Sequence, residues 1–346
     1  SSLLKIFLGL SLILISNAQA PNNPDDSDTI ICGGFLKFST DNPDLKKNLE
    51  YSKIQVQSFS TEMVLKETSY LAASGYYFLP VYEKNSPLII KISGPYGMKF
   101  EPEQYEFEIK DGKTIQDYCK KDIDFKFLGF EIEGQISTFG VNEGPKGIKL
   151  GIFNSDGKKL ETTATVDKGW FKFKPLYPDK NKYLIKPLEK EYMFDEKYKQ
   201  FSFNVNINQK NIFKRTLIIK GYELKGKAIT SNGEPMPGVI AAIYCENKEL
   251  IKDYDCNPEI SEKNKKYVVK IEKYEGKLEP FCYTETAKDG SFNFKNIPYG
   301  EFIVQAFKKN EYVSYSLLPF VQKQYVKHND CELDKPFQVN LFNIYG

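Results

Sequence analysis

The sequence predicts an all-β protein built from tandem immunoglobulin-like β-sandwich domains arranged as a rod. Three observations support this class. Short segments alternate apolar and polar residues, sequence landmarks recur along the chain, and beyond the N-terminal segment no run of ten or more residues has a helical period. A sandwich of about seven short strands needs about 100 residues, which fits the spacing of the landmarks.

Three segments carry the alternation most clearly. In 201–208, phenylalanine, valine and isoleucine alternate with serine and asparagine, and in 105–110 aromatic and aliphatic residues alternate with glutamate and lysine. Residues 148–152 repeat the pattern. Each segment is expected to form a strand with one face in the core and one in solvent.

The first landmark is a glycine, an aromatic residue, glutamate, an aliphatic residue, any residue and a second glycine. It occurs at 129–134 and again 92 residues later at 221–226. A degenerate copy occupies 341–346, so its last glycine follows Gly226 by 120 residues. We expect the chain, which opens without methionine, to be a fragment that stops as another repeat begins.

The second landmark is a turn motif: a glycine, then alternating aromatic residues, then a proline. The turn glycines are Gly75, Gly169 and Gly290, and the third copy continues to Pro298 and Gly300. Glycine supplies the turn geometry, alternate aromatic side chains enter the core, and the Pro-x-Gly step reverses the chain. The Asp-Gly pair at Gly290 could instead belong to a calcium loop, but the acidic residues that such a loop needs are missing.

These landmarks divide the chain. We expect a signal peptide (1–20), a linker (21–29), three β-sandwich domains (30–127, 128–219 and 220–338) and the start of a further repeat (339–346). The two landmarks lie 35 residues apart in the second domain but 64 apart in the third. The third domain is therefore expected to carry an insertion at about 246–279, either a variable surface loop or a functional one.

The N-terminal segment has the features of an export signal. Lys5 precedes an apolar run at 6–15, and the small residues of 16–20 place the expected cleavage after Ala20. Ten apolar residues are too few to span a hydrocarbon core about 30 Å thick, so a membrane anchor is not favoured here.

The six cysteines of the expected mature chain favour disulfides in an oxidising compartment. Cys32 and Cys119 lie at opposite ends of the first domain, where a bridge would tie its first strand to its last. The third domain holds four cysteines, which allow three pairings. Of these, Cys256 with Cys282 and Cys245 with Cys331 is preferred.

Composition excludes several function classes. The 48 basic and 46 acidic residues nearly cancel, which gives nucleic-acid binding no support. The single histidine, His328, argues against His-rich zinc sites and Ser-His-Asp hydrolysis, and its polar surroundings predict a solvated loop without a role. No catalytic, cofactor-binding or metal-binding residue is predicted.

The pattern Gly-x-Phe-x-Phe-x-x-Ile-Pro-x-Gly-x-Phe-x-Val at 290–304 resembles the carboxypeptidase-regulatory-like and transthyretin-like sandwich superfamily. Within it, several segments resemble the nodal modulator family in the same order. They are 31–35, 78–82, 100–102, 124–130, 233–239 and 282–284. The resemblance implies a large type I membrane protein of the endoplasmic reticulum (ER), with many lumenal domains, a C-terminal anchor and no catalytic residues.

The same resemblance implies a non-enzymatic scaffold. Its partners would be a nicalin-like subunit, a small multi-spanning membrane protein and the translocon that handles multi-pass membrane proteins. The alternative is a secreted or surface carbohydrate-binding or adhesive protein, against which we expect the only tryptophan, Trp170, to lie in the core. An enzyme that pairs carboxylates in a cleft is a third class, less favoured because the acidic residues fit the solvated faces of strands.

Overall fold

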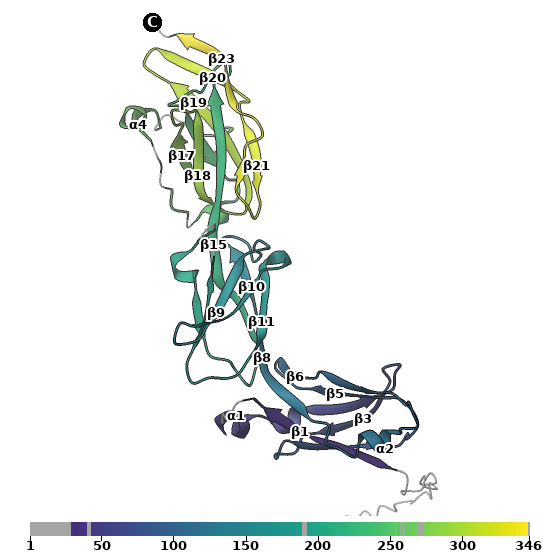
Figure 1. Ribbon diagram of the computed structural model, residues 1–346. Coiled ribbons are helices and arrows are strands. Elements are labelled where there is room, and N and C mark those ends of the chain that lie inside the picture. The colour runs from purple at the N-terminus through teal and green to yellow at the C-terminus, as the bar shows by residue number, and fades with distance from the viewer. Residues whose placement is uncertain are drawn as a thin grey trace, which may run out of the picture. The chain divides into compact units, whose positions relative to one another are not determined.

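The computed structural model describes residues 29–39, 43–188, 192–252, 254–256, 258, 260–268 and 273–344. The expected signal peptide, residues 21–28 of the expected linker and the last two residues of the expected further repeat lie outside this part of the chain. The described residues form two compact units (Figure 1). The first comprises 29–38, 50–93 and 101–126, and the second comprises 39, 43–49, 94–100 and 127–344.

The first unit is one β-sandwich, the first sandwich. In one layer β1 pairs antiparallel with β4, and the facing layer has the strand order β3-β2-β5-β7. The strands are β1 (Ile30–Phe38), β2 (Gln55–Phe59), β3 (Leu65–Tyr70), β4 (Tyr76–Val81), β5 (Leu88–Ser93) and β7 (Gln104–Phe107). Two short helical turns accompany them, η2 (Tyr51–Lys53) and α2 (Ile115–Tyr118). Val56, Leu79 and Ile90 are fully buried, as the alternation requires.

The second unit begins with the second sandwich. Its first layer contains β11, β8 and β15, with β8 and β15 parallel, and its second layer has the order β10-β9-β12-β14. The strands of the second unit up to residue 229 are β6 (Met98–Glu101), β8 (Phe125–Thr138), β9 (Lys149–Phe153), β10 (Lys159–Ala164), β11 (Trp170–Leu176), β12 (Tyr183–Pro187), β13 (Met193–Phe194), β14 (Phe201–Phe203) and β15 (Asn211–Ile229). The helices of the same part of the unit are α1 (Pro43–Asn48), η3 (Asp167–Gly169) and η4 (Glu196–Tyr198).

The third sandwich completes the second unit and shares β15, which runs into it from the second sandwich (Figure 1). One layer contains β18, β15 and β22, and the other has the order β17-β16-β19-β21, with the antiparallel pair of β20 and β23 beside them. Its strands are β16 (Ile240–Tyr244), β17 (Cys282–Glu285), β18 (Ser291–Ile297), β19 (Gly300–Lys309), β20 (Val313–Leu318), β21 (Gln322–Val326), β22 (Cys331–Glu332) and β23 (Phe337–Ile344). The all-β tandem-sandwich prediction is confirmed.

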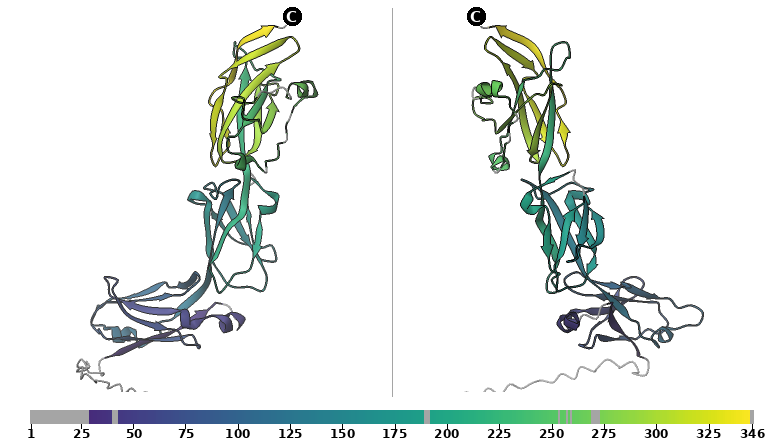
Figure 2. Two further views of the ribbon diagram at one scale, coloured as in Figure 1. Left: turned by 180° about the vertical axis from the view of Figure 1, so that it is seen from behind. Right: turned by 60° about the vertical axis from the view of Figure 1, so that its left-hand side comes forward.

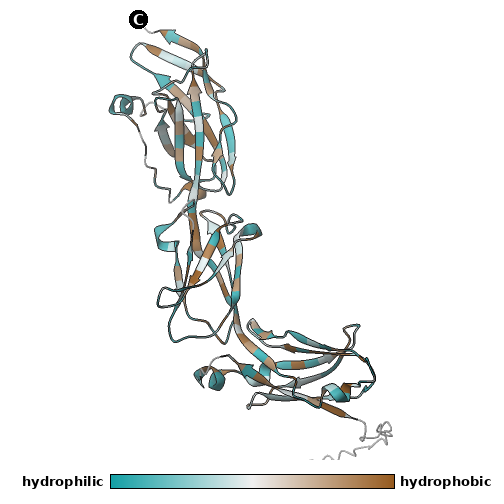
Figure 3. Ribbon diagram, in the orientation of Figure 1, coloured by the Kyte–Doolittle hydropathy of each residue, from teal (hydrophilic) through white to brown (hydrophobic). Residues whose placement is uncertain are grey.

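Hydropathy follows the strand period. Hydrophobic and hydrophilic bands alternate along β8 and β15 (Figure 3). The predicted strand at 201–208 is shorter than expected, because β14 ends at Phe203. Beyond it the buried Asn211 side chain accepts a hydrogen bond from the backbone N–H of Asn206 (2.7 Å) and donates one to its carbonyl (3.0 Å), so a side chain replaces a strand partner.

The first landmark has a packing reason. Gly134 and Gly226, its final glycines in β8 and β15, lie opposite Phe171 and Phe292 of the adjacent strands. A β-carbon on either glycine would lie 2.3 Å from the Cζ atom of that ring. The glycine therefore makes the space that the first buried phenylalanine of the turn motif fills.

The turn motif has one geometry in all three copies. Gly75, Gly169 and Gly290 adopt φ of 80°, 77° and 76°, the left-handed region that favours glycine, and each precedes a strand. Two aromatic rings of β18, Phe292 and Phe294, are buried, and the chain reverses over residues 298–299 before β19 starts at Gly300.

The segment that the sequence analysis predicts as an insertion covers a sheet of the third sandwich. Residues 246–279 include two short helices, α3 (Lys248–Ile251) and α4 (Glu262–Val268), which stand beside the sheets (Figure 2). Every residue of β16 is buried, and two of them, Ala242 and Tyr244, pack against Tyr274 and Leu278 of the insertion. The insertion therefore shields a sheet face that would otherwise meet solvent.

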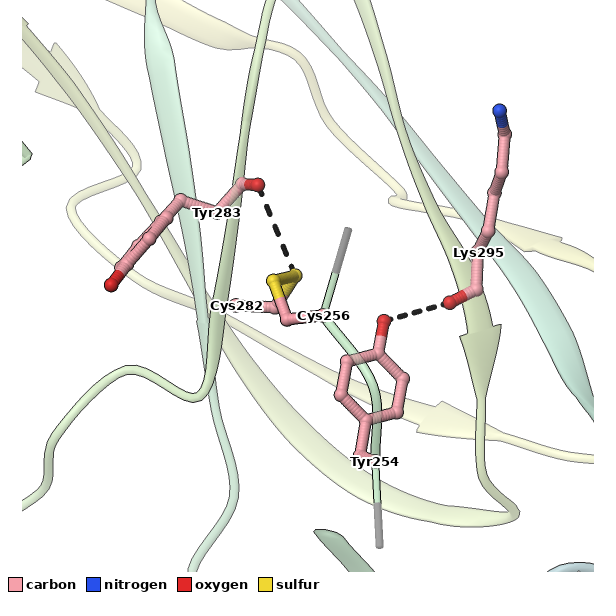
Figure 4. Close-up of a disulfide and its surroundings, with 5 residues drawn as sticks. All are labelled: Tyr254, Cys256, Cys282, Tyr283 and Lys295. Carbon is pink, nitrogen blue, oxygen red and sulfur yellow. Dashed lines mark hydrogen bonds between the residues drawn. A yellow bond between two sulfur atoms is a disulfide. The ribbon is translucent and has the colours of Figure 1, made fainter. Parts of the chain in front are cut away.

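Two disulfides are present, Cys32–Cys119 and Cys256–Cys282, which are the pairings that the sequence analysis preferred. Figure 4 shows the second, beside which the Tyr254 hydroxyl donates to the Lys295 carbonyl (2.7 Å) of β18. The bridge thus ties the insertion to β17 near a strand of the other layer.

The predicted third bridge, Cys245 with Cys331, is wrong, since both cysteines are free. Cys245 follows β16 in one layer and is buried, whereas Cys331 lies opposite Leu224 of β15 in the other layer. Burial raises the pKa of the Cys245 thiol and raises that of Cys331 to about 11, so both remain protonated at neutral pH.

Candidate interaction site

The outer face of β1 and β4 is apolar. The register places Ile31 opposite Pro80 and Phe35 opposite Tyr76, with Phe78 between them on β4. Side chains that alternate along paired strands share one face. We call these five residues the apolar sheet face, and Phe78, exposed over 61% of its surface, is its most prominent member.

The inner face of the same two strands is apolar too. Cys32, Leu36, Tyr77 and Leu79 alternate with the outward residues and are buried in the first sandwich. A strand that is apolar on both faces is typical of a sheet covered on both sides. The outer face is therefore a candidate contact surface. Two short and nearly continuous apolar runs in the sequence, in β1 and β4, indicate it.

A groove adjoins this face at the C-terminal end of β4. We call it the hairpin groove; its volume is about 430 Å³. It lies between the β2–β3 hairpin and the segment that joins β4 to β5, and it is lined by residues 58–62, 64, 66–67, 80–83 and 86–88. Val64 and Tyr82 form exposed apolar walls, with 54% and 59% of their surfaces open to solvent.

The rim of the hairpin groove is acidic. Its charged residues are Glu62, Glu67, Glu83 and Lys66, which sum to −2 at neutral pH. The ammonium of Lys66 donates to Glu83 across the groove (2.9 Å), and this hydrogen bond holds the pKa of the Glu83 carboxyl below its usual value. Glu62 is exposed and Glu67 is half-buried, and both line the groove.

His328 is not in a solvated loop, which corrects the sequence prediction. It is half-buried where the second and third sandwiches meet, and its Nδ1 lies 3.1 Å from the Tyr222 hydroxyl and 3.3 Å from Thr138 Oγ1. Its ring stacks on Tyr299, with the centroids 4.6 Å apart. Burial lowers its pKa. The polar neighbours in sequence hid a contact that only the fold creates.

Trp170 also differs from the prediction of a core residue. It is half-buried on the outward side of β11, with the ammonium of Lys214 5.2 Å from the ring centroid. The adjacent residue, Phe171, takes the core position instead. The Gly-Trp-Phe order allows either aromatic residue to point inward, and the pairing register decides which does.

Two buried threonines were missed by sequence reasoning. Thr165 and Thr286 each donate to a carbonyl (2.8 and 2.7 Å) and accept a backbone N–H (2.9 Å in both). Each stands four residues before a turn glycine, so comparison of the repeats could have found them.

A second hollow, of about 600 Å³, opens in the second unit between β12–β13 and parts of β15 and β18. Its charged lining residues are three lysines and three acids, Lys186, Lys199, Lys295, Glu196, Glu223 and Asp330. Three positive and three negative side chains favour neither an anionic nor a cationic ligand. Across the described ranges, no cluster of three or more metal-ligating side chains occurs, and none of the helices is both long and apolar enough to span a membrane.

The fold defines a tandem β-sandwich protein of the transthyretin-like kind, without a clustered metal site in its described part. Family models match it in chain order: "BOS complex subunit NOMO1-like, first beta sandwich domain" at 38–127, the corresponding second domain at 127–220, and "NOMO third transthyretin-like domain" at 222–340. The chain belongs to the nodal modulator (NOMO) family.

Relatives support this assignment. The chain is 27% identical to human "BOS complex subunit NOMO1" and 28% identical to the mouse protein of that name, with 97% of this chain and 26% of each relative aligned. "Nicotinic receptor-associated protein 4" of Caenorhabditis elegans is 25% identical over 87% of this chain and 25% of its own length. The chain thus spans about a quarter of the length of these relatives.

Solved structures also resemble the chain. The Bacillus anthracis TIE protein aligns over 91% of this chain and 51% of its own, with 17% identity and a TM-score of 0.26. BcpA, the major pilin subunit of Bacillus cereus, aligns over 90% of this chain and 99% of its own, with 12% identity and the same TM-score.

Proposed function

We propose that the chain is the N-terminal part of a non-enzymatic scaffold subunit of an ER membrane complex of the BOS type. The observation that carries this proposal is the match of three successive NOMO domain models, in order, across nearly all of the described residues. Human relatives that align over 97% of this chain are named BOS complex subunits. Tandem sandwiches expose many edges and loops to partners while they bury little surface between domains.

The proposal includes a location. The sandwiches face the ER lumen, the signal peptide is cleaved after Ala20, and the subunit is a type I membrane protein with its anchor outside this chain. The two disulfides support an oxidising compartment, because they are rare in reducing ones. Its partners would be a nicalin-like subunit, a small multi-spanning protein and the translocon for multi-pass membrane proteins.

The proposed domains are 30–127, 128–219 and 220–338, with a further repeat from 339. In β23, Phe342 and Ile344 are 59% and 71% exposed. The residues at the same landmark positions in β8, Phe130 and Ile132, are fully buried in the sandwich that follows. We infer that β23 is the first strand of another sandwich, whose core would bury these two side chains.

Purification of the full-length protein from its own cells in mild detergent, followed by mass spectrometry, tests the scaffold role. We expect stoichiometric recovery of a nicalin-like subunit and of translocon components. Recovery of the protein from the medium, or without a stoichiometric membrane partner, would refute it.

Carbohydrate binding is the second candidate, and the surface position of Trp170 favours it. A tryptophan ring at the surface offers a flat apolar face on which a sugar ring can stack. Titration of oligosaccharides against the chain and its Trp170→Ala variant tests this function. Micromolar binding that the substitution removes, with the fold intact, would support it over the scaffold role.

A further inference from the structure

The hairpin groove combines features that are typical of binding sites. Its volume of about 430 Å³ lies within the usual range of ligand sites, about 300–1,000 Å³. Its walls include apolar side chains that the fold leaves open, Val64 and Tyr82. Exposed apolar surface rimmed by charge marks interaction sites on soluble domains.

The strands beside the groove determine the shape of a ligand. β3 and β4 are the last strands of their layers, so each carries backbone groups that no strand of the described chain pairs. An extended polypeptide can add to such an edge through its own backbone, with alternate side chains entering the pockets beside it. Pro80 of β4 is consistent with an edge, since proline is confined to edges, strand starts and bulges.

The charge of the groove determines the chemistry of that ligand. Three carboxylates face one ammonium, and that ammonium already pairs with Glu83. Glu62 and Glu67 remain to attract cations, whereas anionic lipid headgroups and acidic peptides would be repelled. Among the described residues, these carboxylates do not gather closely enough to hold a metal ion.

We propose that the hairpin groove binds an extended segment of a partner polypeptide in which apolar side chains alternate with lysine or arginine. The apolar side chains would pack against Val64 and Tyr82, and the cations would lie beside Glu62 and Glu67. This inference rests on the proposed scaffold role, for which it supplies one partner-binding site in the first sandwich.

The direct test is fluorescence anisotropy with the purified, disulfide-bonded chain. The probe is a labelled peptide, Lys-Val-Lys-Val-Lys-Val-Lys. Two control peptides replace every valine by glycine or every lysine by glutamate. We expect saturable binding of the probe and at least about tenfold weaker binding of both controls. Tenfold is less affinity than one fully buried valine side chain contributes. Equal binding of either control would overturn the proposal.

Variants locate the site. The double variant Glu62→Gln/Glu67→Gln should bind the probe about four- to tenfold more weakly, with a smaller dependence on salt. Val64→Ser should weaken it by about threefold or more. The matched control is Glu103→Gln, an exposed carboxylate of the same sandwich outside the groove. Binding unchanged in the first two variants, or weakened equally in the third, would contradict the assignment.

Two other occupants are measurable. Sedimentation velocity that shows self-association abolished by Val64→Ser would assign the groove to a second copy of the chain. Capture by phosphatidylcholine–phosphatidylserine vesicles that the same substitution abolishes would assign it to lipid. Either result overturns the proposal. Peptide binding uses only the purified chain, so its failure leaves the scaffold role standing, and failed co-purification leaves the peptide result standing.

Discussion

Replacing Gly134 with alanine should destabilise the second sandwich through a single contact. The new β-carbon would lie 2.3 Å from Cζ of Phe171, whereas non-bonded carbons prefer about 3.5–4.0 Å. The ring would have to move by more than about 1 Å. It is 3% exposed and packs edge-on against Phe173, with centroids 5.9 Å apart, so little space is available.

The expected loss follows from two opposing effects. Overpacking a filled core costs about 1–3 kcal/mol. Alanine also restricts the unfolded chain, which offsets about 0.5–1 kcal/mol, and the backbone of Gly134 is not left-handed, so no conformational strain is added. We expect a net decrease of about 1–2 kcal/mol in the free energy of unfolding.

A double-mutant cycle isolates the contact. Phe171→Leu alone should cost about 1–2 kcal/mol, because it leaves a cavity. Combined with Gly134→Ala it should cost less than the sum by at least about 1 kcal/mol, since the smaller side chain vacates the space that the methyl group needs.

Denaturant unfolding followed by fluorescence suits this cycle, because Trp170, the only tryptophan of the chain, adjoins Phe171. Lys174→Ala, an exposed position on the same strand, is the control and should change stability by less than about 0.5 kcal/mol. Strict additivity of the two core substitutions, or a Gly134→Ala variant as stable as the parent, would refute the packing argument.

Further predictions concern the disulfide, the histidine and a buried hydroxyl. Replacing Cys32 and Cys119 by serine opens an 88-residue loop and should lower stability by about 4–5 kcal/mol in the chain-entropy model, measured by denaturant unfolding. Because burial lowers the folded-state pKa of His328, the free energy of unfolding should fall as the pH drops from about 6.5 through that pKa. The free energy of unfolding of the His328→Gln variant should fall less between pH 7.5 and 5. Thr286→Val should cost about 1–3 kcal/mol, since a buried N–H and a buried carbonyl lose their partner.

Each of these has a control. Cys331→Ser replaces a free cysteine and should change stability far less than loss of the first bridge. Lys327→Gln, next to the histidine but exposed, should leave the pH dependence as it is in the parent. Thr286→Ser keeps the hydroxyl and should recover most of the lost stability; a serine variant as unstable as valine would show that the methyl group, not the hydrogen bonds, matters.

The sequence alone determined the fold class, the repeats and the turns. Strand alternation and turn glycines are local properties: side chains two residues apart share a face, and only glycine enters the left-handed region without strain. The positive φ of Gly75, Gly169 and Gly290 follows from that chemistry. Landmark spacing also predicts the insertion at about 246–279, because an added segment lengthens the distance between two landmarks along the chain.

Only the tertiary structure decided which residues meet. Cys245 and Cys331 share a domain but lie in different layers, and no sequence count distinguishes the layers. The register turned Phe171 inward and Trp170 outward, and the fold brought His328 to Tyr222, 106 residues away. The hairpin groove likewise lies between the β2–β3 hairpin and the β4–β5 connection, which are separate segments of the chain. Such contacts depend on how strands pair and pack, which local patterns do not encode.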